Sequence, residues 1–143
     1  MDIFSTMKIS ASALKAQRLR LNAISSNLAN IETTRTPDGG PYRKREVVFQ
    51  STSLGFADAL DSRMRDAAQG VKVSHVQASN RPPLMVYDPD HPDADEQGML
   101  AMPNINLVEE TADMMSASRA YESNVTVIKS AKRMALKALE IGR

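Results

Sequence analysis

Residues 3–31 read IFSTMKISASALKAQRLRLNAISSNLANI, and the spacing of their apolar side chains decides the fold of this end of the chain. Two apolar lines recur every seven residues: Met7, Leu14, Leu21 and Leu28 form the first, and Ile24 and Ile31 belong to the second, three residues further on. This heptad pattern is typical of a helix that packs along one side against another helix. Ser10 and Gln17 occupy the second line in the first half and weaken the pattern there.

The far end of the chain, residues 104–143, carries a second helical pattern. Asn106 and Glu109, directly after Pro103, have the spacing of an N-cap with a capping-box acid and predict a helix that begins near Leu107. Two lines repeat at seven: Leu107, Met114, Tyr121, Ile128 and Ala135, and then Thr111, Ser118, Val125, Lys132 and Leu139. A further apolar line consists of Val127, Met134 and Ile141. We therefore expect this helix to be contacted from more than one side.

The middle of the chain differs sharply from both ends. All seven prolines and five of the six glycines lie between Pro37 and Pro103. Short apolar runs predict strands within 42–50, 71–76 and 84–87, whereas 54–70 fits a helix or a loop equally well. The sequence thus predicts a mainly α fold with a small β-rich insert. Its long terminal helices would lie in residues 1–36 and 104–143 and pair as a coiled coil around a turn-rich segment, 37–103.

Composition removes several classes of function. The chain has 143 residues, 18 basic against 17 acidic, so we expect no nucleic-acid partner. It contains no cysteine, which excludes disulfides and thiolate chemistry. No apolar run approaches the length of a membrane span, so we expect no membrane insertion. The first 21 residues lack the features of a cleavable secretory signal, and any export is expected to use another route.

The densest group of possible metal ligands is the acidic segment 88–96, DPDHPDADE. Read as a calcium loop from Asp88, it has Asp93 at the glycine position and Met99 at the terminal acid position, so the motif fails at both. We expect a solvated acidic turn, with no metal, no cofactor and no enzymatic activity. A metal-dependent hydrolase using Asp88, Asp90, His91 and Asp93 is the alternative.

Three further features are weaker candidates. Ser74 and His75 are neighbours on a predicted strand, so they should point to opposite faces and not pair. The basic run 43–45 is expected to be a solvated strand end, and Gly39-Gly40 a tight turn. The first helix is basic and lacks acids from residue 3 to 31, which implies an acidic partner surface. It also leaves open a membrane-surface adaptor.

Several blocks of sequence resemble one known family. LKAQRLRL at 14–21, NLAN at 27–30 and TTRTP at 33–37 are similar to the N-terminal motif of flagellar rod, hook and related axial proteins. GGPYRKREVVF at 39–49 and YDPDHPDAD at 87–95 resemble the proximal-rod C-type subunits of the flagellar basal body. PN at 103–104, MSASRAYESN at 115–124 and KRMALKALEIG at 132–142 are similar to the C-terminal helix of those subunits. Glu32, Met99 and Met102 depart from the family pattern.

The resemblance implies a structural subunit of the proximal rod, which assembles through its terminal helices into the axial drive shaft. It implies export by the flagellar type III apparatus, a place in the periplasmic rod, and contacts with other rod subunits, basal-body components and copies of itself. The expected subunit-packing residues are Leu14, Leu21, Ile24, Leu28, Ile31, Met114, Tyr121, Val125, Ile128 and Leu139. The residues that match the family motif are Asn27, Leu28, Ala29, Asn30, Thr33, Tyr42, Arg119, Tyr121 and Asn124.

Overall fold

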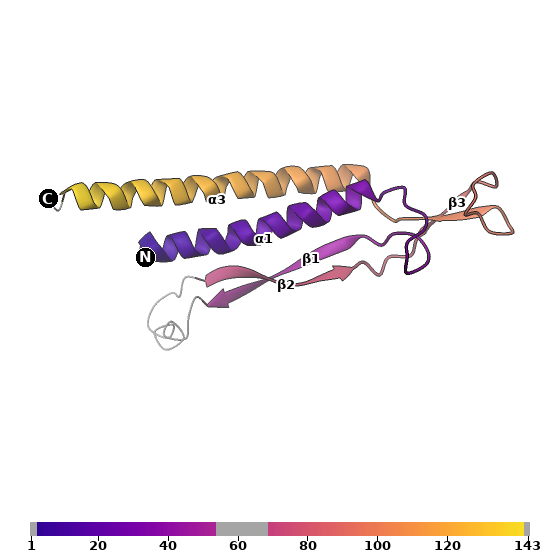
Figure 1. Ribbon diagram of the computed structural model, residues 1–143, viewed down its shortest axis with the longest axis horizontal. Coiled ribbons are helices and arrows are strands. Elements are labelled where there is room, and N and C mark those ends of the chain that lie inside the picture. The colour runs from indigo at the N-terminus through magenta and orange to yellow at the C-terminus, as the bar shows by residue number, and fades with distance from the viewer. Residues whose placement is uncertain (1–2, 54–68, 142–143) are drawn as a thin grey trace.

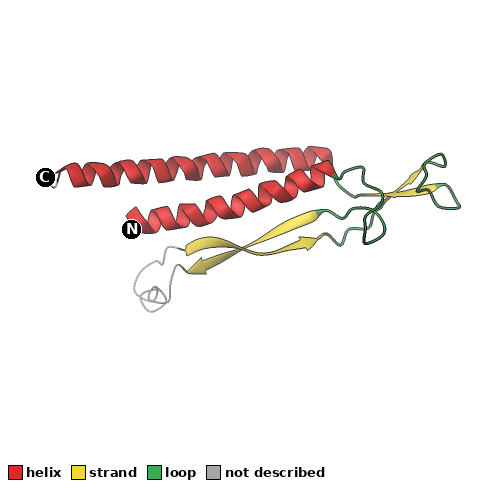
Figure 2. Cartoon of the chain, in the orientation of Figure 1, coloured by secondary structure: helices red, strands yellow, loops and turns green. Residues whose placement is uncertain are grey.

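The computed structural model describes residues 3–53 and 69–141 (Figures 1 and 2). Its elements are α1 (Ile3–Ala29), β1 (Arg45–Ser53), β2 (Gln69–Ala78), β3 (Leu84–Tyr87), β4 (Met99–Met102) and α3 (Leu107–Ile141). The predicted class, mainly α with a small β insert, is confirmed. Of the segment that the sequence left undecided, 54–68 lies outside the described residues, while Gln69 and Gly70 begin β2.

Helix α1 lies between the other two long elements. α3 runs antiparallel along one side of it and the β1–β2 hairpin along the other, whereas β3 and β4 project beyond the helix pair (Figure 1). The helices approach through small side chains, since Ala16, Ala23, Ala117 and Ala131 are all buried. Because α1 is covered on two sides, the second heptad line is buried at Ser10 and Ile24. Ser10, whose polar side chain weakens this line in the sequence, thus belongs to the core.

Each β hairpin is a separate two-stranded antiparallel sheet. In the first, Arg45 pairs with Ala78 and Ser53 with Gln69, with a bulge between Val48 and Phe49. In the second, Leu84 pairs with Met102 and Tyr87 with Met99. The three predicted strands are found within β1, β2 and β3, although the first begins at Arg45 and not at Tyr42. The fourth strand, β4, was not predicted, because its sequence MLAM is too short to show a period of two.

Side-chain caps fix both helix ends at this side of the molecule. Asn106 Oδ1 accepts hydrogen bonds from the amides of Val108 and Glu109 at 2.9 and 3.3 Å, so the predicted start of α3 is confirmed. At the end of α1, Asn30 Nδ2 donates to the carbonyl of Ser26 at 2.8 Å and satisfies one of the last helical acceptors. α1 therefore ends at Ala29 and not near residue 36, and Ile31 lies outside the helix.

Candidate functional site: the polar junction and the exposed helix faces

A buried amide, Asn27, joins three elements near the end of α1. Its Oδ1 accepts the amide of Arg45 at 2.8 Å, and its Nδ2 donates to the carbonyl of the same residue at 3.0 Å. Nδ2 also donates to Glu110 Oε2 at 3.1 Å, while Oδ1 accepts the hydroxyl of Tyr42 at 3.1 Å. With 1% of its surface exposed, Asn27 holds α1, the start of β1 and the start of α3 at one point.

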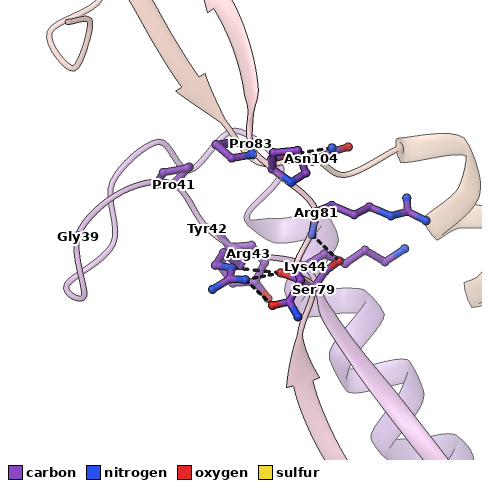
Figure 3. A pocket seen from close by; sticks show the side chains of 11 residues that line it. Gly39, Pro41, Tyr42, Arg43, Lys44, Ser79, Arg81, Pro83 and Asn104 are labelled. Atoms are coloured by element: carbon purple, nitrogen blue, oxygen red, sulfur yellow. Dashed lines mark hydrogen bonds between the residues drawn. The ribbon is translucent and has the colours of Figure 1, made fainter.

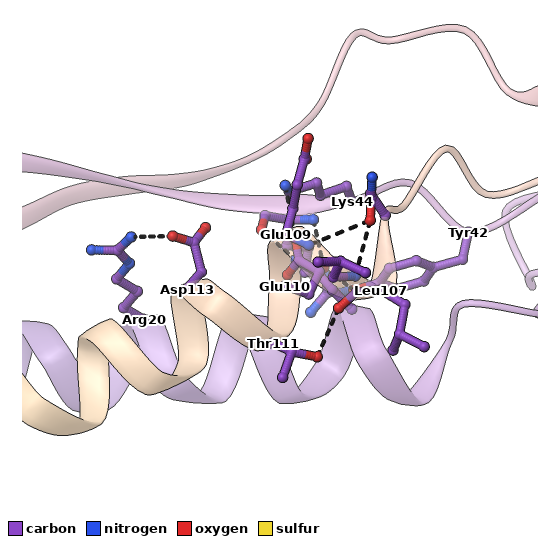
Figure 4. Close-up of polar contacts among 12 residues, drawn as sticks. Arg20, Tyr42, Lys44, Leu107, Glu109, Glu110, Thr111 and Asp113 are labelled. Atoms are coloured by element: carbon purple, nitrogen blue, oxygen red, sulfur yellow. Dashed lines mark hydrogen bonds and ion pairs between the residues drawn. The ribbon is translucent and has the colours of Figure 1, made fainter.

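The charge of Glu110 is balanced inside the same junction. Glu110 is 1% exposed, and Lys44 Nζ lies 2.6 Å from its Oε1 (Figure 4). A buried carboxylate without a cation and hydrogen bonds would be strongly destabilising. Nearer the surface, Arg20 Nη2 pairs with Asp113 Oδ1 at 3.0 Å and joins α1 to α3 a second time. We call Asn27, Tyr42, Lys44, Arg45 and Glu110 the polar junction.

The loop that follows α1 is tied to the polar junction by the motif residues. Thr33 Oγ1 donates to Asn30 Oδ1 at 3.1 Å, and the carbonyl of Thr33 accepts the amide of Tyr42 at 3.0 Å. The Tyr42 hydroxyl also lies 3.2 Å from Ser26 Oγ. The motif from 27 to 42 is therefore one hydrogen-bonded unit, which closes the turn between helix and strand.

Other motif residues lie elsewhere. Asn124 Nδ2 donates to the carbonyl of Ala120 at 2.8 Å within α3, and Arg119 and Ala29 are exposed. Leu28 and Tyr121 are half-buried. The structure thus gathers the N-terminal motif around one junction but does not bring the C-terminal motif residues to it.

The expected packing residues are incompletely covered within one subunit. Ile24 is buried, and Leu139 is 72% exposed. The others are half-buried: Leu14, Leu21, Leu28, Ile31, Met114, Tyr121, Val125 and Ile128. Further along the outside of α3, the apolar side chains of Met115, Val127, Met134 and Leu136 are exposed. α3 therefore carries apolar surface that the subunit itself does not bury.

The acidic segment 88–96 forms turns at the end of the β3–β4 hairpin. Asp95 Oδ1 accepts the amides of Gln97 and Met99, both at 2.9 Å, and Asp93 Oδ2 accepts the hydroxyl of Thr34 at 2.8 Å. Across residues 3–53 and 69–141, no three His, Cys, Asp or Glu side chains are grouped so as to hold a metal ion. These carboxylates support the turn and the adjoining loop.

Two sequence-based expectations were wrong. Ser74 Oγ and His75 Nδ1 do pair, at 3.2 Å, at the level of the β bulge, but both are exposed and His75 Nε2 faces Gln77 Oε1 instead of an acid. In the basic run 43–45, Arg43 and Arg45 are exposed, so the expectation of a solvated strand end fails at Lys44, whose side chain is 14% exposed. Lys44 is held by Glu110, and Arg43 donates to the carbonyl of Ser79 at 2.7 Å. Sequence reasoning missed the Lys44–Glu110 pair because the two residues are distant in the chain.

The Gly39-Gly40 turn was predicted correctly, since both glycines have positive φ, 86° and 74°.

The basic side chains Lys8, Lys15 and Arg18 of α1 are exposed. Within the described parts of the chain, no helix is both long and apolar enough to cross a membrane.

Comparison with known proteins gives consistent matches. Residues 7–35 match the model for "Flagella basal body rod protein", and residues 96–141 match the model for "Flagellar basal body rod FlgEFG protein C-terminal". The flagellar basal-body rod protein FlgC of Borreliella burgdorferi is 44% identical over 99% of this chain and 98% of its own length. The proteins of the same name from Bacillus subtilis and Salmonella typhimurium are each 42% identical over the full length of both chains.

Paired long helices, an internal polar junction and exposed apolar side chains on α3 are typical of a structural subunit that packs against other chains. The identities over essentially the whole chain identify the class further. The chain belongs to the flagellar basal-body rod protein FlgC family. It is a non-enzymatic structural subunit located in the basal-body rod, and neither the hydrolase nor the membrane-adaptor alternative has support.

Proposed function

We propose that the terminal segments, 1–36 and 104–143, form the helical core of the rod, with α1 and α3 pairing as a coiled coil inside each subunit and packing against neighbouring subunits. The observation that carries this proposal is the incomplete burial of the heptad residues. α1 is covered on two sides, yet Leu21, Leu28, Tyr121 and Ile128 remain half-buried. Neighbouring helices in the rod would cover what remains. The segment 37–103 would then provide the outer contacts between subunits.

The length of α3 supports contacts beyond the subunit. α3 has 35 residues and α1 has 27, so at about 1.5 Å per residue α3 is longer by roughly 12 Å. Its C-terminal end extends past the start of α1 (Figure 1). Isolated helical turns with exposed apolar side chains such as Leu136 and Leu139 gain stability mainly from packing. A neighbouring helix is the partner that fits this end.

We further infer that the subunit leaves the cytoplasm through the flagellar type III export apparatus and assembles in the periplasmic part of the basal body. This proposal is supported by the family to which the chain belongs. In a strain whose export ATPase is deleted, the subunit should remain in the cytoplasmic fraction. Its appearance in the periplasm of that strain would show a different route.

The packing proposal is tested by Leu28→Asp in a non-motile deletion strain. A charge placed between helices has no partner there, and the cost of burying it recurs in every subunit of the assembly. We expect loss of swimming and of rods in isolated basal bodies, although the variant is expressed and exported. Lys15→Ala, which removes an exposed charge on the same helix, should swim normally. Normal rods containing Leu28→Asp protein would remove Leu28 from the packing surface.

A further inference from the structure

The β3–β4 hairpin carries apolar side chains that the described part of the subunit leaves largely exposed. Leu84, Met85, Val86 and Tyr87 are 48%, 53%, 42% and 69% exposed, although they form consecutive residues of one strand. A two-stranded sheet of four-residue strands is only marginally stable in water. The hairpin also projects away from the helices (Figure 1). Such a hairpin gains stability when a second surface covers it.

The end of this hairpin is acidic and tightly built. Gly98 has φ of 76°, and a Cβ there would lie 3.0 Å from the ring of Tyr87 and 3.1 Å from Pro89, so the chain turns closely at this point. Asp90 and Glu96 are exposed, and neither side chain has a hydrogen bond or ion pair within the described residues. The hairpin end therefore presents an aromatic ring and free carboxylates together.

The base of the same hairpin carries basic side chains and apolar rings, which complement the carboxylates and the tyrosine at its end. A pocket of about 300 Å³ lies there, lined by Gly39, Pro41, Tyr42, Arg43, Lys44, Ser79, Asn80, Arg81, Pro82, Pro83 and Asn104 (Figure 3). The rings of Pro41 and Tyr42 give it apolar walls. Asn104 Nδ2 holds the carbonyl of Pro82 at 2.9 Å and fixes the opposite wall.

Of the three cations at this pocket, Lys44 is paired with Glu110, whereas Arg43 and Arg81 have no anionic partner within the described residues. Within the described residues, Arg43 donates to neutral oxygens, the carbonyl of Ser79 and Asn80 Oδ1, at 2.7 and 3.0 Å. Arg81 is exposed, and its guanidinium has no ion pair in the part of the chain that the structure describes. Arg43 and Arg81 extend to different sides of the pocket (Figure 3). An occupant with several carboxylates would complement both charges.

We propose that this pocket receives the acidic end of the β3–β4 hairpin from a second copy of the chain. Tyr87 of one copy would lie against the proline and tyrosine walls of the next, with its neighbouring carboxylates close to Arg81 and Arg43. The two surfaces differ, so the contact is head-to-tail and repeats in a ring or a helix without closing on a dimer. This inference rests on the proposed function, because it needs copies of the chain to be neighbours in the rod.

Disulfide trapping tests the contact directly, since the chain has no cysteine of its own. We expect Arg81→Cys/Asp90→Cys subunits in oxidised basal bodies to give dimers and higher multimers that reduction converts to monomer. Within one chain, six steps of about 3.3 Å separate Arg81 from Tyr87 in extended form, roughly 20 Å, and Asp90 follows in the turn after Tyr87, so an internal bridge is not expected. The control pair, Lys15→Cys/Asp90→Cys, should stay monomeric. Only monomer from the first pair, in rods that contain it, would overturn the proposal.

Charge exchange provides a second test with variants that should fold, because neither the Arg81 nor the Asp90 side chain has an ion pair among residues 3–53 and 69–141. Arg81→Glu and Asp90→Arg should each reduce swimming when expressed alone. Expressed together they should restore it, because each variant then offers the surface that the other lacks. Normal swimming of either variant alone, or no restoration in the mixture, would contradict the proposal. Failure of the unmodified gene to restore rods in the deletion strain would instead contradict the proposed function.

Discussion

The two ends of the helix pair are held in opposite ways. At the polar junction, Asn27 and Glu110 are each 1% exposed, and hydrogen bonds and an ion pair within the subunit hold them. At the other end, α3 extends beyond α1 and Leu139 is 72% exposed (Figure 1). Hydrogen bonds and a buried ion pair demand fixed geometry, whereas apolar side chains accept many partners. The junction thus sets the shape of the subunit, and the free end is available for neighbours.

The largest effect on the isolated subunit is expected for Glu110→Gln. The change leaves the ammonium of Lys44 without its carboxylate in a site where the Lys44 side chain is only 14% exposed. Breaking a buried pair costs about 3 kcal/mol or more of the free energy of unfolding. Urea unfolding followed by far-UV circular dichroism measures this loss. The adjacent, exposed Glu109→Gln should change little, and equal stabilities for the two variants would refute the importance of the pair.

A smaller loss is expected for Asn27→Ala. Truncation leaves the amide of Arg45 and the hydroxyl of Tyr42 without their acceptor in a buried setting. Orphaned groups of this kind cost about 1 to 3 kcal/mol. The same urea titration reports the effect. Asn22→Ala, an exposed change on the same helix, is the control, and the idea of a central amide fails if both variants unfold at the same urea concentration.

Arg20→Ala should lower the free energy of unfolding by less than Asn27→Ala does. The pair with Asp113 has side chains that are 31% and 47% exposed, so water screens it and its contribution is below about 1 kcal/mol. Added salt should reduce the difference from the unmodified subunit. Arg18→Ala, which removes an exposed charge without a partner in the described residues, gives the baseline. If Arg20→Ala lowered the free energy of unfolding as much as Glu110→Gln, the Arg20–Asp113 pair would have to be counted as part of the polar junction.

The smallest effect on stability is expected at the free end. Leu139→Asp should change the unfolding free energy by no more than about 0.5 kcal/mol, because the subunit does not bury this side chain. It should nevertheless reduce rod assembly in the deletion strain. Ala138→Asp introduces the same charge at the adjacent position and should be milder if Leu139 contacts a neighbour. If Leu139→Asp strongly destabilised the purified subunit, the free end would also be held by contacts within the subunit, and the contrast between the two ends would be wrong.

Sequence reasoning succeeded where local chemistry decides the outcome. Asn106 after a proline was enough to place the start of α3, and two glycines were enough to place a turn. The end of α1 was placed too late, because Asn30 caps the helix with a side chain that no periodicity reports. The apolar runs at 42–50 and 71–76 predicted two strands, but they could not show that these strands pair with each other or that they pack against α1.

Only some residues of the polar junction could be predicted from the sequence. Asn27 and Tyr42 were identified through the family motif, but nothing nearby in the chain marks Lys44 and Glu110 as partners. Glu110 belongs to an acidic first turn, where the helix dipole already explains its presence. Long-range pairing in three dimensions, here across three elements, decides its burial. The packing residues remain a prediction, because the partners that we propose for them would lie in other subunits.

The way in which Asn27 contacts Arg45 bears on how this family can vary. The amide recognises the N–H and carbonyl of Arg45, which every residue except proline possesses. Position 45 is therefore open to almost any side chain during evolution, while position 27 requires a group that both donates and accepts at short reach. We therefore expect the residue type at position 45 to vary among relatives, while position 27 keeps asparagine, although the two residues form one contact.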